Sequence, residues 1–189
     1  MRYLITGAQG FLGRYLAARL LEHEETAAVF GLGRSPFLPG SFSHQVHWGE
    51  ERVQAPLPAC LGGIDGDPRY RYESVDLLDQ PALTAVLRSL QPTVIFHLAA
   101  SLRDDPPEVL IRNNVGGTLS LLEAAAGASI PAPKVVIGSS GAVYGEPISL
   151  PIQEGQPCSP RDYYSASKRA AEDMARVASQ QHGIPALWA

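Results

Sequence analysis

Hydrophobic and polar positions along the chain follow two periods in turn, which predicts strands alternating with helices. Short apolar runs bounded by Gly, Pro or polar residues are typical of buried parallel strands. We expect strands at 3–5, 27–32, 72–75, 93–99, 135–138 and 186–188. Between them, apolar residues recur at intervals of three and four, as on amphipathic helices. We expect helices at 12–21, 81–90, 107–126 and 162–182.

This alternation predicts an α/β fold: a doubly wound, Rossmann-like parallel sheet with helices on both faces. Asp79 is expected to cap the helix at 81–90, which ends before Pro92. The exception is 35–71, which is rich in Gly and Pro and has no clear period. We interpret it as an irregular insertion with a short helix near 50–61. At 189 residues the chain fits one domain, residues 1–189.

Composition narrows the function. A net charge of −4 argues against a nucleic-acid-binding surface, and no apolar run approaches membrane-spanning length. Because the first expected strand starts at residue 3, we expect no signal peptide. Cys60 and Cys158 lie far apart, without metal-ligand spacing, so we expect inert thiols and no metal. A reducing, cytoplasmic setting is therefore the default expectation.

A glycine-rich motif, Gly7-Ala8-Gln9-Gly10-Phe11-Leu12-Gly13, lies between the first strand and the first helix. This context turns a glycine pattern into a dinucleotide-site hypothesis. Gly7 would permit the tight turn, Gly10 would let the backbone approach a pyrophosphate, and Gly13 would allow close helix–strand packing. The helix N-terminus would supply N–H donors to the phosphates. The alternative is an ordinary glycine-rich loop.

Candidate binding residues follow the second and third strands. Arg34 stands where an NAD enzyme usually places an acidic residue for the ribose 2′-hydroxyl, and an arginine there suits the 2′-phosphate of NADP. The alternative is a solvated arginine at a loop start. Asp76 would accept a hydrogen bond from the adenine amino group, or cap the next helix, although Asp79 is better placed for that.

Further candidates follow the fourth and fifth strands. The small residues of Leu98-Ala99-Ala100 would let a nucleotide lie against the backbone. The preceding His97 is interpreted as a core histidine with satisfied hydrogen bonds rather than a catalyst. Ser140 follows the fifth strand, where its hydroxyl would bond a substrate oxygen, although Ser in a Gly-rich turn is also common for local reasons.

The pair Tyr164 and Lys168 supplies a base and its activator at one helical spacing, because residues four apart share a helix face. A phenol, with a reference pKa of about 10, is a poor base at neutral pH. A nearby ammonium favours the phenolate and lowers that pKa. The pair alone is weak, since it also arises by chance on surface helices, but it gains weight from the motifs before it.

Taken in order, six motifs resemble the extended short-chain dehydrogenase/reductase family, in its nucleotide-sugar epimerase/dehydratase branch. They are Gly7-x-x-Gly10-Phe11-x-Gly13, Asp76-x-x-Asp79, His97-Leu98-Ala99-Ala100, Asn114-Val115-x-Gly117-Thr118, Ser139-Ser140-x-x-Val143-Tyr144-Gly145 and Tyr164-x-x-x-Lys168. The resemblance implies an NAD(P)-dependent oxidoreductase or epimerase that acts on a nucleotide-linked sugar by hydride transfer. The Arg34 end of the second strand looks most like NADP-using members, among them GDP-mannose dehydratases and GDP-keto-deoxysugar reductases.

The resemblance also implies residue roles. Tyr164 would be the acid/base, Lys168 would hold the cofactor ribose and activate Tyr164, Ser140 would polarise the sugar oxygen, and Asn114 would support the site. The implied cofactor-binding residues are Gly7, Gly10, Phe11, Leu12, Gly13, Arg34, Asp76, Leu77, Leu98, Ala99, Ala100, Tyr164 and Lys168. NADP is the preferred cofactor, with NAD as the alternative. Relatives pair the helices at 107–126 and 162–182 in a homodimer, which we also expect here.

Two departures matter. Family members continue into a smaller C-terminal domain that binds the nucleotide-sugar, and these residues stop at Ala189, so we expect that domain to be absent from this chain. Dehydratases usually carry an acidic residue beside the catalytic serine, whereas here Gly141 and Ala142 follow Ser140, which favours a reductase or epimerase. The alternative function is a truncated, non-catalytic dinucleotide-binding module that senses a cofactor or pairs with a partner.

Overall fold

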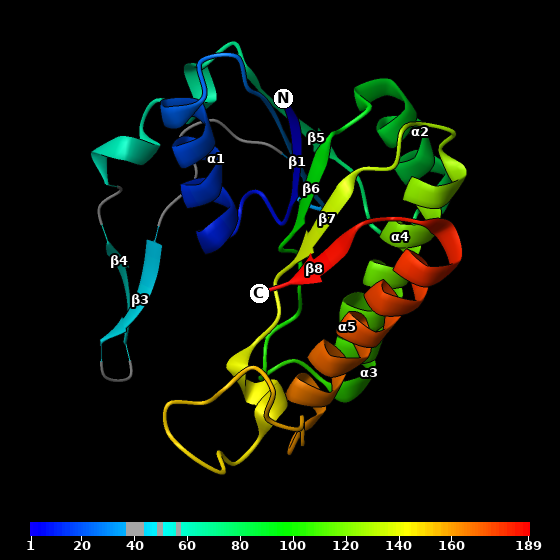
Figure 1. The fold of residues 1–189 in the computed structure, drawn as a ribbon. Helices are drawn as coiled ribbons and strands as arrows, with labels where there is room; N and C mark the ends of the chain where they lie inside the picture. Colours follow the sequence, from blue (N-terminus) through cyan, green and yellow to red (C-terminus); the bar gives the residue numbers. More distant parts are fainter. Residues whose placement is uncertain (37–43, 49–50, 56–57) are drawn as a thin grey trace.

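Six parallel strands form the central sheet of the protein (Figure 1). The computed structural model describes residues 1–36, 44–48, 51–55 and 58–189. The strand order is β5-β2-β1-β6-β7-β8, and every neighbouring pair is parallel. The strands are β1 Arg2–Thr6, β2 Ala28–Gly33, β5 Tyr70–Ser74, β6 Val94–His97, β7 Lys134–Ile137 and β8 Ala186–Trp188. Each predicted strand is present, with its ends moved by up to two residues.

Helices cover both faces of the sheet, which confirms the predicted doubly wound fold (Figure 1). On one face lies α1, Phe11–His23. On the other lie α2 Gln80–Leu90, α4 Gly117–Gly127 and α5 Tyr163–His182. Each face has its own hydrophobic core, one built around Ala17 and Leu21 of α1, the other around Leu83 of α2 and Leu121 of α4. Two-sided burial explains why the inner strands β1, β2, β6 and β7 read as mostly apolar runs.

Strand β1 has β2 along one edge and β6 along the other. From β1 the chain goes first to β2 and β5, and later returns to β6 on the opposite edge. The strand order therefore reverses between β1 and β6. In open α/β sheets, ligands bind in the crevice outside the carboxyl ends of the strands at this switch point. The Gly-rich turn after β1 and the Ala-rich turn after β6 both lie there.

The prediction for 35–71 was wrong in part. The segment contains an antiparallel pair, β3 His44–Trp48 and β4 Glu51–Ala55, and the single 3₁₀ turns Ala59–Leu61 and Ile64–Gly66. Strand β4 thus occupies residues 51–55 of the region where a short helix was expected, and a 3₁₀ turn occupies Ala59–Leu61. Val46 pairs with Val53, and apolar residues alternate with polar ones in both strands, a period-two signal that the Gly and Pro content obscured. Residues 37–43, 49–50 and 56–57 lie outside the described residues.

The predicted helix at 107–126 is present but is not α-helical throughout. It begins as α3, Pro107–Leu110, continues as a π-helical segment, Ile111–Gly116, and resumes as α4. A π turn carries one residue more than an α turn, and such turns are frequent at functional sites.

The predicted cap Asp79 and one of the two thiols can be placed. Asp79 accepts a hydrogen bond from the backbone N–H of Ala82 at 3.1 Å, as a helix cap does. Cys158 is a free thiol, and the side chain of Cys60 lies outside what the structure describes. Across the described residues, no helix combines the length and the apolar character needed to cross a membrane.

Candidate functional site

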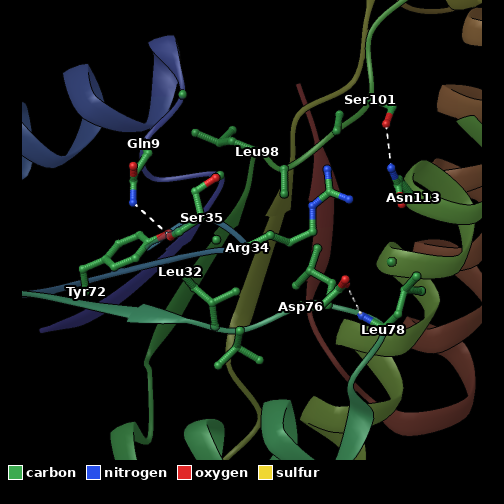
Figure 2. Close-up of a pocket in the computed structure, with 18 residues that line it drawn as sticks. Gln9, Leu32, Arg34, Ser35, Tyr72, Asp76, Leu78, Leu98, Ser101 and Asn113 are labelled. Carbon is green, nitrogen blue, oxygen red and sulfur yellow. Dashed lines mark hydrogen bonds between the residues drawn. The ribbon is translucent and has the colours of Figure 1, made fainter. Parts of the chain in front are cut away.

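A cleft of about 260 Å³ opens at the carboxyl ends of β1, β2, β5 and β6, at the switch point of the sheet (Figure 2). Its walls come from the turns that follow these strands and from the π-helical segment. The lining residues are Gly7, Gln9, Gly10, Leu32, Gly33, Arg34, Ser35, Tyr72, Val75, Asp76, Leu77, Leu78, Leu98, Ala99, Ala100, Ser101, Asn113 and Gly117. Eight of the residues predicted to bind a cofactor are among them.

The glycine motif is divided between the cleft and the protein interior. Gly7 and Gly10 line the cleft, and Gly10 is the N-cap of α1 without a capping side chain, so the helix N-terminus lies at the cleft wall. Gly7 has a φ of +70°, and a Cβ there would lie 2.8 Å from the backbone N of Ala99. Gly13 lies outside the cleft, where a Cβ would meet the Gly7 carbonyl oxygen at 2.4 Å, as predicted for a packing glycine.

The other two residues of this motif do not line the cleft. Phe11 and Leu12 are the first residues of α1, and their side chains are 64% and 63% exposed. A ligand in the cleft would therefore meet this turn through the backbone rather than through these side chains.

At the end of β2, Arg34 lines the cleft and is exposed (Figure 2). The adjoining loop is held by two side chains that sequence reasoning missed. Gln9 Nε2 donates to the carbonyl oxygen of Ser35 at 3.3 Å, and the Tyr72 hydroxyl donates to the same oxygen at 2.7 Å. Burial raises the pKa of Tyr72, and its hydrogen bond to Gln9 opposes that rise. The hydroxyl therefore stays protonated and available as a donor.

At the end of β5, the carboxylate of Asp76 lines the cleft and accepts a hydrogen bond from the backbone N–H of Leu78 at 3.0 Å (Figure 2). Asp79, not Asp76, caps helix α2. Leu77 is 9% exposed and joins the core beneath the cleft while still contributing to its wall.

Across the cleft, Leu98, Ala99 and Ala100 continue into Ser101, which is only 7% exposed. Asn113, from the π-helical segment, donates to the hydroxyl of Ser101 at 2.8 Å (Figure 2). Neither Ser101 nor Asn113 was predicted. Their only sequence signal is position, because each directly adjoins a motif residue.

Asn114 lies behind this wall, not in the cleft, and is 2% exposed. Its amide bonds the backbone of Ser101, and its Nδ2 also donates to Ser167 Oγ of α5 at 2.9 Å. Asn113 and Asn114 are consecutive, and both bond Ser101: Asn113 bonds its hydroxyl and Asn114 its backbone. Asn114 therefore ties the cleft wall to α5.

His97 belongs to a closed line of buried hydrogen bonds, so it is a core histidine as interpreted. Thr6 Oγ1 lies 2.7 Å from Nδ1, and Thr118 Oγ1 lies 2.9 Å from Nε2. Because Thr118 donates to the Asn114 carbonyl oxygen at 2.6 Å, the network assigns the proton of His97 to Nε2. Burial, followed by the charge of Lys168, lowers the pKa of His97 to about 3.

The predicted catalytic residues lie beside the cleft rather than in its lining. Helix α5, begun by a capping box of Asp162 and Ser165, holds Tyr164 and Lys168 one turn apart. Lys168 is 9% exposed, and its Nζ donates to the Gly138 carbonyl oxygen at 2.9 Å. Burial lowers the pKa of this ammonium.

The remaining predicted catalytic residue, Ser140, begins the 3₁₀ turn Gly141–Tyr144, where its hydroxyl accepts from the N–H of Ala142 at 3.2 Å. It is half-buried, as is Tyr164. The local role that serine often has in such turns is therefore present, alongside any role toward a substrate.

A further side chain near Tyr164, Arg103, was not predicted. Its guanidinium carbon lies 5.4 Å from the centre of the Tyr164 ring, and it forms an ion pair with Asp162. The loop after β6 is thereby attached to the start of α5. No sequence pattern marks Arg103, because the contact joins segments about 60 residues apart.

No group of His, Cys, Asp and Glu side chains suited to a metal ion occurs among residues 1–36, 44–48, 51–55 and 58–189. The cleft instead combines a glycine-rich turn at a helix N-terminus, small residues at a second strand end and a switch point between them. These features define the class of dinucleotide-binding Rossmann-fold proteins.

Comparison with known proteins agrees and is more specific. Residues 3–189 match the model of the NAD dependent epimerase/dehydratase family, and the chain belongs to that family. It is 32% identical over 191 residues to a UDP-glucose 4-epimerase of Streptomyces lividans, covering 98% of this chain and 50% of that protein. A UDP-glucose 4-epimerase of Mycolicibacterium smegmatis is 36% identical over 179 residues, covering 91% of this chain and 49% of the relative.

Among solved structures, UDP-glucose 4-epimerase from Brucella ovis in complex with NAD superposes with a TM-score of 0.76 at 26% identity, covering 99% of this chain and 50% of that one. The chain therefore spans about half the length of the relatives it matches. The family assignment confirms the predicted epimerase/dehydratase resemblance. The likeness to GDP-mannose dehydratases and reductases stays a prediction.

Proposed function

We propose that the chain is the dinucleotide-binding part of an NAD(P)-dependent enzyme that acts on a nucleotide-linked sugar. The observation that carries the proposal is the contact between the switch-point cleft and the helix that holds Tyr164 and Lys168. Asn114 bonds Ser101 of the cleft wall and Ser167, the residue directly before Lys168. The proposed binding and reacting groups are thus linked by hydrogen bonds through Asn114.

The cleft residues fit a dinucleotide. The backbone at Gly7 and Gly10, with the N-terminus of α1, would hold the pyrophosphate. Asp76 and Leu77 would contact the adenine end, and Leu98, Ala99 and Ala100 would lie against the nucleotide. When bound, the nicotinamide would accept and return a hydride.

The chain's own residues would move the proton. Tyr164 would take it from a sugar hydroxyl as the adjoining carbon is oxidised and return it on reduction. The Lys168 ammonium has three N–H donors, one of which is bonded to Gly138, so it also has donors for the cofactor ribose. Its charge would stabilise the Tyr164 phenolate, while Ser140 would bond the reacting sugar oxygen and Asn114 would hold the cleft wall in place.

We further propose that NADP binds more tightly than NAD. The support is Arg34, an exposed guanidinium at the end of β2, where its charge would meet a 2′-phosphate. A solved relative is an NAD complex, so NAD is the alternative cofactor.

Epimerisation or reduction is favoured over dehydration. Gly141 and Ala142 follow Ser140 and place no carboxylate beside it in the 3₁₀ turn. The similarity to two UDP-glucose 4-epimerases points the same way.

We also propose a homodimer in the cytoplasm. Helices α4 and α5 pack side by side on one face (Figure 1), and three outward apolar side chains lie on or beside them. Ile111, Leu119 and Val177 are 60%, 42% and 38% exposed. The free thiol of Cys158 fits a reducing compartment. Sedimentation as a monomer at micromolar concentration would contradict the dimer.

Two measurements on the naturally produced polypeptide test the function. Titration calorimetry with NADP and NAD should show binding, and a survey of nucleotide-sugars should show turnover that requires the cofactor. Cofactor binding without turnover on any nucleotide-sugar would instead support the non-catalytic sensor. Absence of binding would contradict both.

A further inference from the structure

Helix α5 carries a third polar side chain on the face that holds Tyr164 and Lys168. Glu172 lies one turn beyond Lys168, so the three residues follow one another at four-residue spacing. Glu172 is 3% exposed. Its Oε1 accepts a hydrogen bond from the hydroxyl of Ser139, and its Oε2 accepts one from Arg169 at 3.2 Å.

Burying this carboxylate is costly, since ion pairs rarely regain the full cost of removing a charge from water. Among the described residues, Arg169 is the cation that forms an ion pair with Glu172. It is 36% exposed and also bonds Asp173 at 3.1 Å. The ion pair is therefore shared and partly solvated. The ion pair alone therefore gives a weak reason for a buried carboxylate at this position. The hydrogen bond from Ser139 gives a second one, because it links α5 to the end of β7.

Two successive turns of α5 bind two successive residues at the end of β7. Lys168 Nζ donates to the Gly138 carbonyl oxygen at 2.9 Å, and Glu172 accepts from the Ser139 hydroxyl. Ser140 comes next and begins the 3₁₀ turn. The position of Ser140 relative to α5 is thus set by a backbone contact from Lys168 and a side-chain contact from Glu172.

We propose that Glu172 is a positioning residue for the acid/base set, acting through Ser139 to hold the Ser140 turn against the helix that carries Tyr164. This positioning role rests on the proposed function only in one respect: Ser140 and Tyr164 must act on the same substrate. In this role Glu172 would act through Ser139 rather than by touching substrate or cofactor. A displacement of reacting groups by about 1 Å can cost about 10²-fold in rate, so a contact of this kind affects turnover far more than binding.

The catalytic test compares Glu172→Ala, Glu172→Gln and Ser139→Ala in the naturally produced polypeptide. Glu172→Ala and Ser139→Ala should each lower kcat by about 10- to 100-fold, while the Kd for NADP stays within about twofold. Glu172→Gln keeps an oxygen that accepts from Ser139 and should recover most of kcat. Asp173→Asn is the matched control, because it alters the other carboxylate on Arg169 without touching Ser139, and should leave kcat unchanged.

A second measurement does not need turnover. Amide hydrogen exchange across residues 138–145 should speed up in Glu172→Ala and in Ser139→Ala. The double variant should show the same increase as each single variant, because both remove one contact. Exchange should stay slow in Glu172→Gln and Asp173→Asn. If the polypeptide turns over no nucleotide-sugar, the proposed function fails and exchange alone decides the positioning role. Unchanged exchange in Glu172→Ala, or equal kcat losses in Glu172→Ala and Asp173→Asn, would overturn it.

Discussion

The side-chain amide of Asn114 holds both backbone polar groups of Ser101. Its Oδ1 accepts from the Ser101 N–H at 2.7 Å, and its Nδ2 donates to the Ser101 carbonyl oxygen at 3.2 Å. A backbone segment in the wall of the cleft is therefore fixed by one side chain from the π-helical segment, as a strand partner would fix it.

Replacing that side chain should loosen the wall. Asn114→Ala leaves the buried polar groups of Ser101 without these partners and should lower the free energy of unfolding by about 2–3 kcal/mol. Asn113→Ala, its neighbour, loses a single bond to the Ser101 hydroxyl at the cleft and should cost about 1 kcal/mol. Urea unfolding of both variants measures the difference, and equal losses would contradict the assigned role of Asn114.

Cofactor choice should depend on Arg34. NADP should bind more tightly than NAD, and Arg34→Ala should narrow that difference by about 1.5–3 kcal/mol, the contribution of a charge-assisted hydrogen bond. Arg71→Ala removes an exposed arginine of β5 that does not line the cleft, and should leave the preference unchanged. Calorimetry that finds equal affinities for both nucleotides in the unaltered protein would rule out this assignment.

Turnover should depend on the Tyr164 hydroxyl. Tyr164→Phe keeps the ring and deletes the acid/base group, so kcat should fall by about 10²–10⁴-fold with little change in cofactor affinity. Lys168→Met should harm both turnover and cofactor binding, because one ammonium serves both. Tyr163→Phe alters the adjacent, 67% exposed phenol and is the control. Unchanged steady-state rates for Tyr164→Phe would leave the sensor interpretation in its place.

Acid should destabilise the fold through His97. Its pKa is lowered to about 3 in the folded protein, whereas the unfolded chain takes up a proton near the ordinary value of 6.5. Between these pH values the unfolded state binds more protons, so stability falls as the pH falls, by about 1.4 kcal/mol per pH unit. Unfolding at about pH 7, 6 and 5 measures the slope. His97→Gln should flatten the dependence of the unfolding free energy on pH, and His182→Gln should not. The same slope in both variants would contradict the assignment of this pH dependence to His97.

How much of the site could be predicted depends on how local each contact is. Gly7, Gly10, Arg34 and Asp76 all lie in the turns that follow strands, and parallel strands bring their carboxyl ends to one edge of the sheet, so a linear pattern was enough. The contacts of the π-helical segment could not be predicted in this way, because Asn114 bonds Ser101 in the loop after β6 and Ser167 of α5, which lie far apart in the sequence.

The other missed features divide similarly. Gln9 follows β1, Tyr72 lies in β5, and Ser35 follows β2, which lies between those two strands. The side chains of Gln9 and Tyr72 therefore both reach the Ser35 carbonyl oxygen through the sheet order, which the sequence does not show. The pair β3 and β4, in contrast, carries a readable period of two. Glu172 also carries a signal, since it repeats the spacing of Tyr164 and Lys168 once more along α5.

The hydrogen bonds around His97 all run in one direction. Ala99 donates to Thr6, Thr6 to His97, His97 to Thr118, and Thr118 to the carbonyl oxygen of Asn114. An amide N–H begins the line and an amide oxygen ends it, and neither exchanges a proton readily at neutral pH. The line therefore has no outlet for a proton. The imidazole of His97 is thus insulated from the neighbouring cleft, so it would not compete as a base with Tyr164 in the proposed reaction.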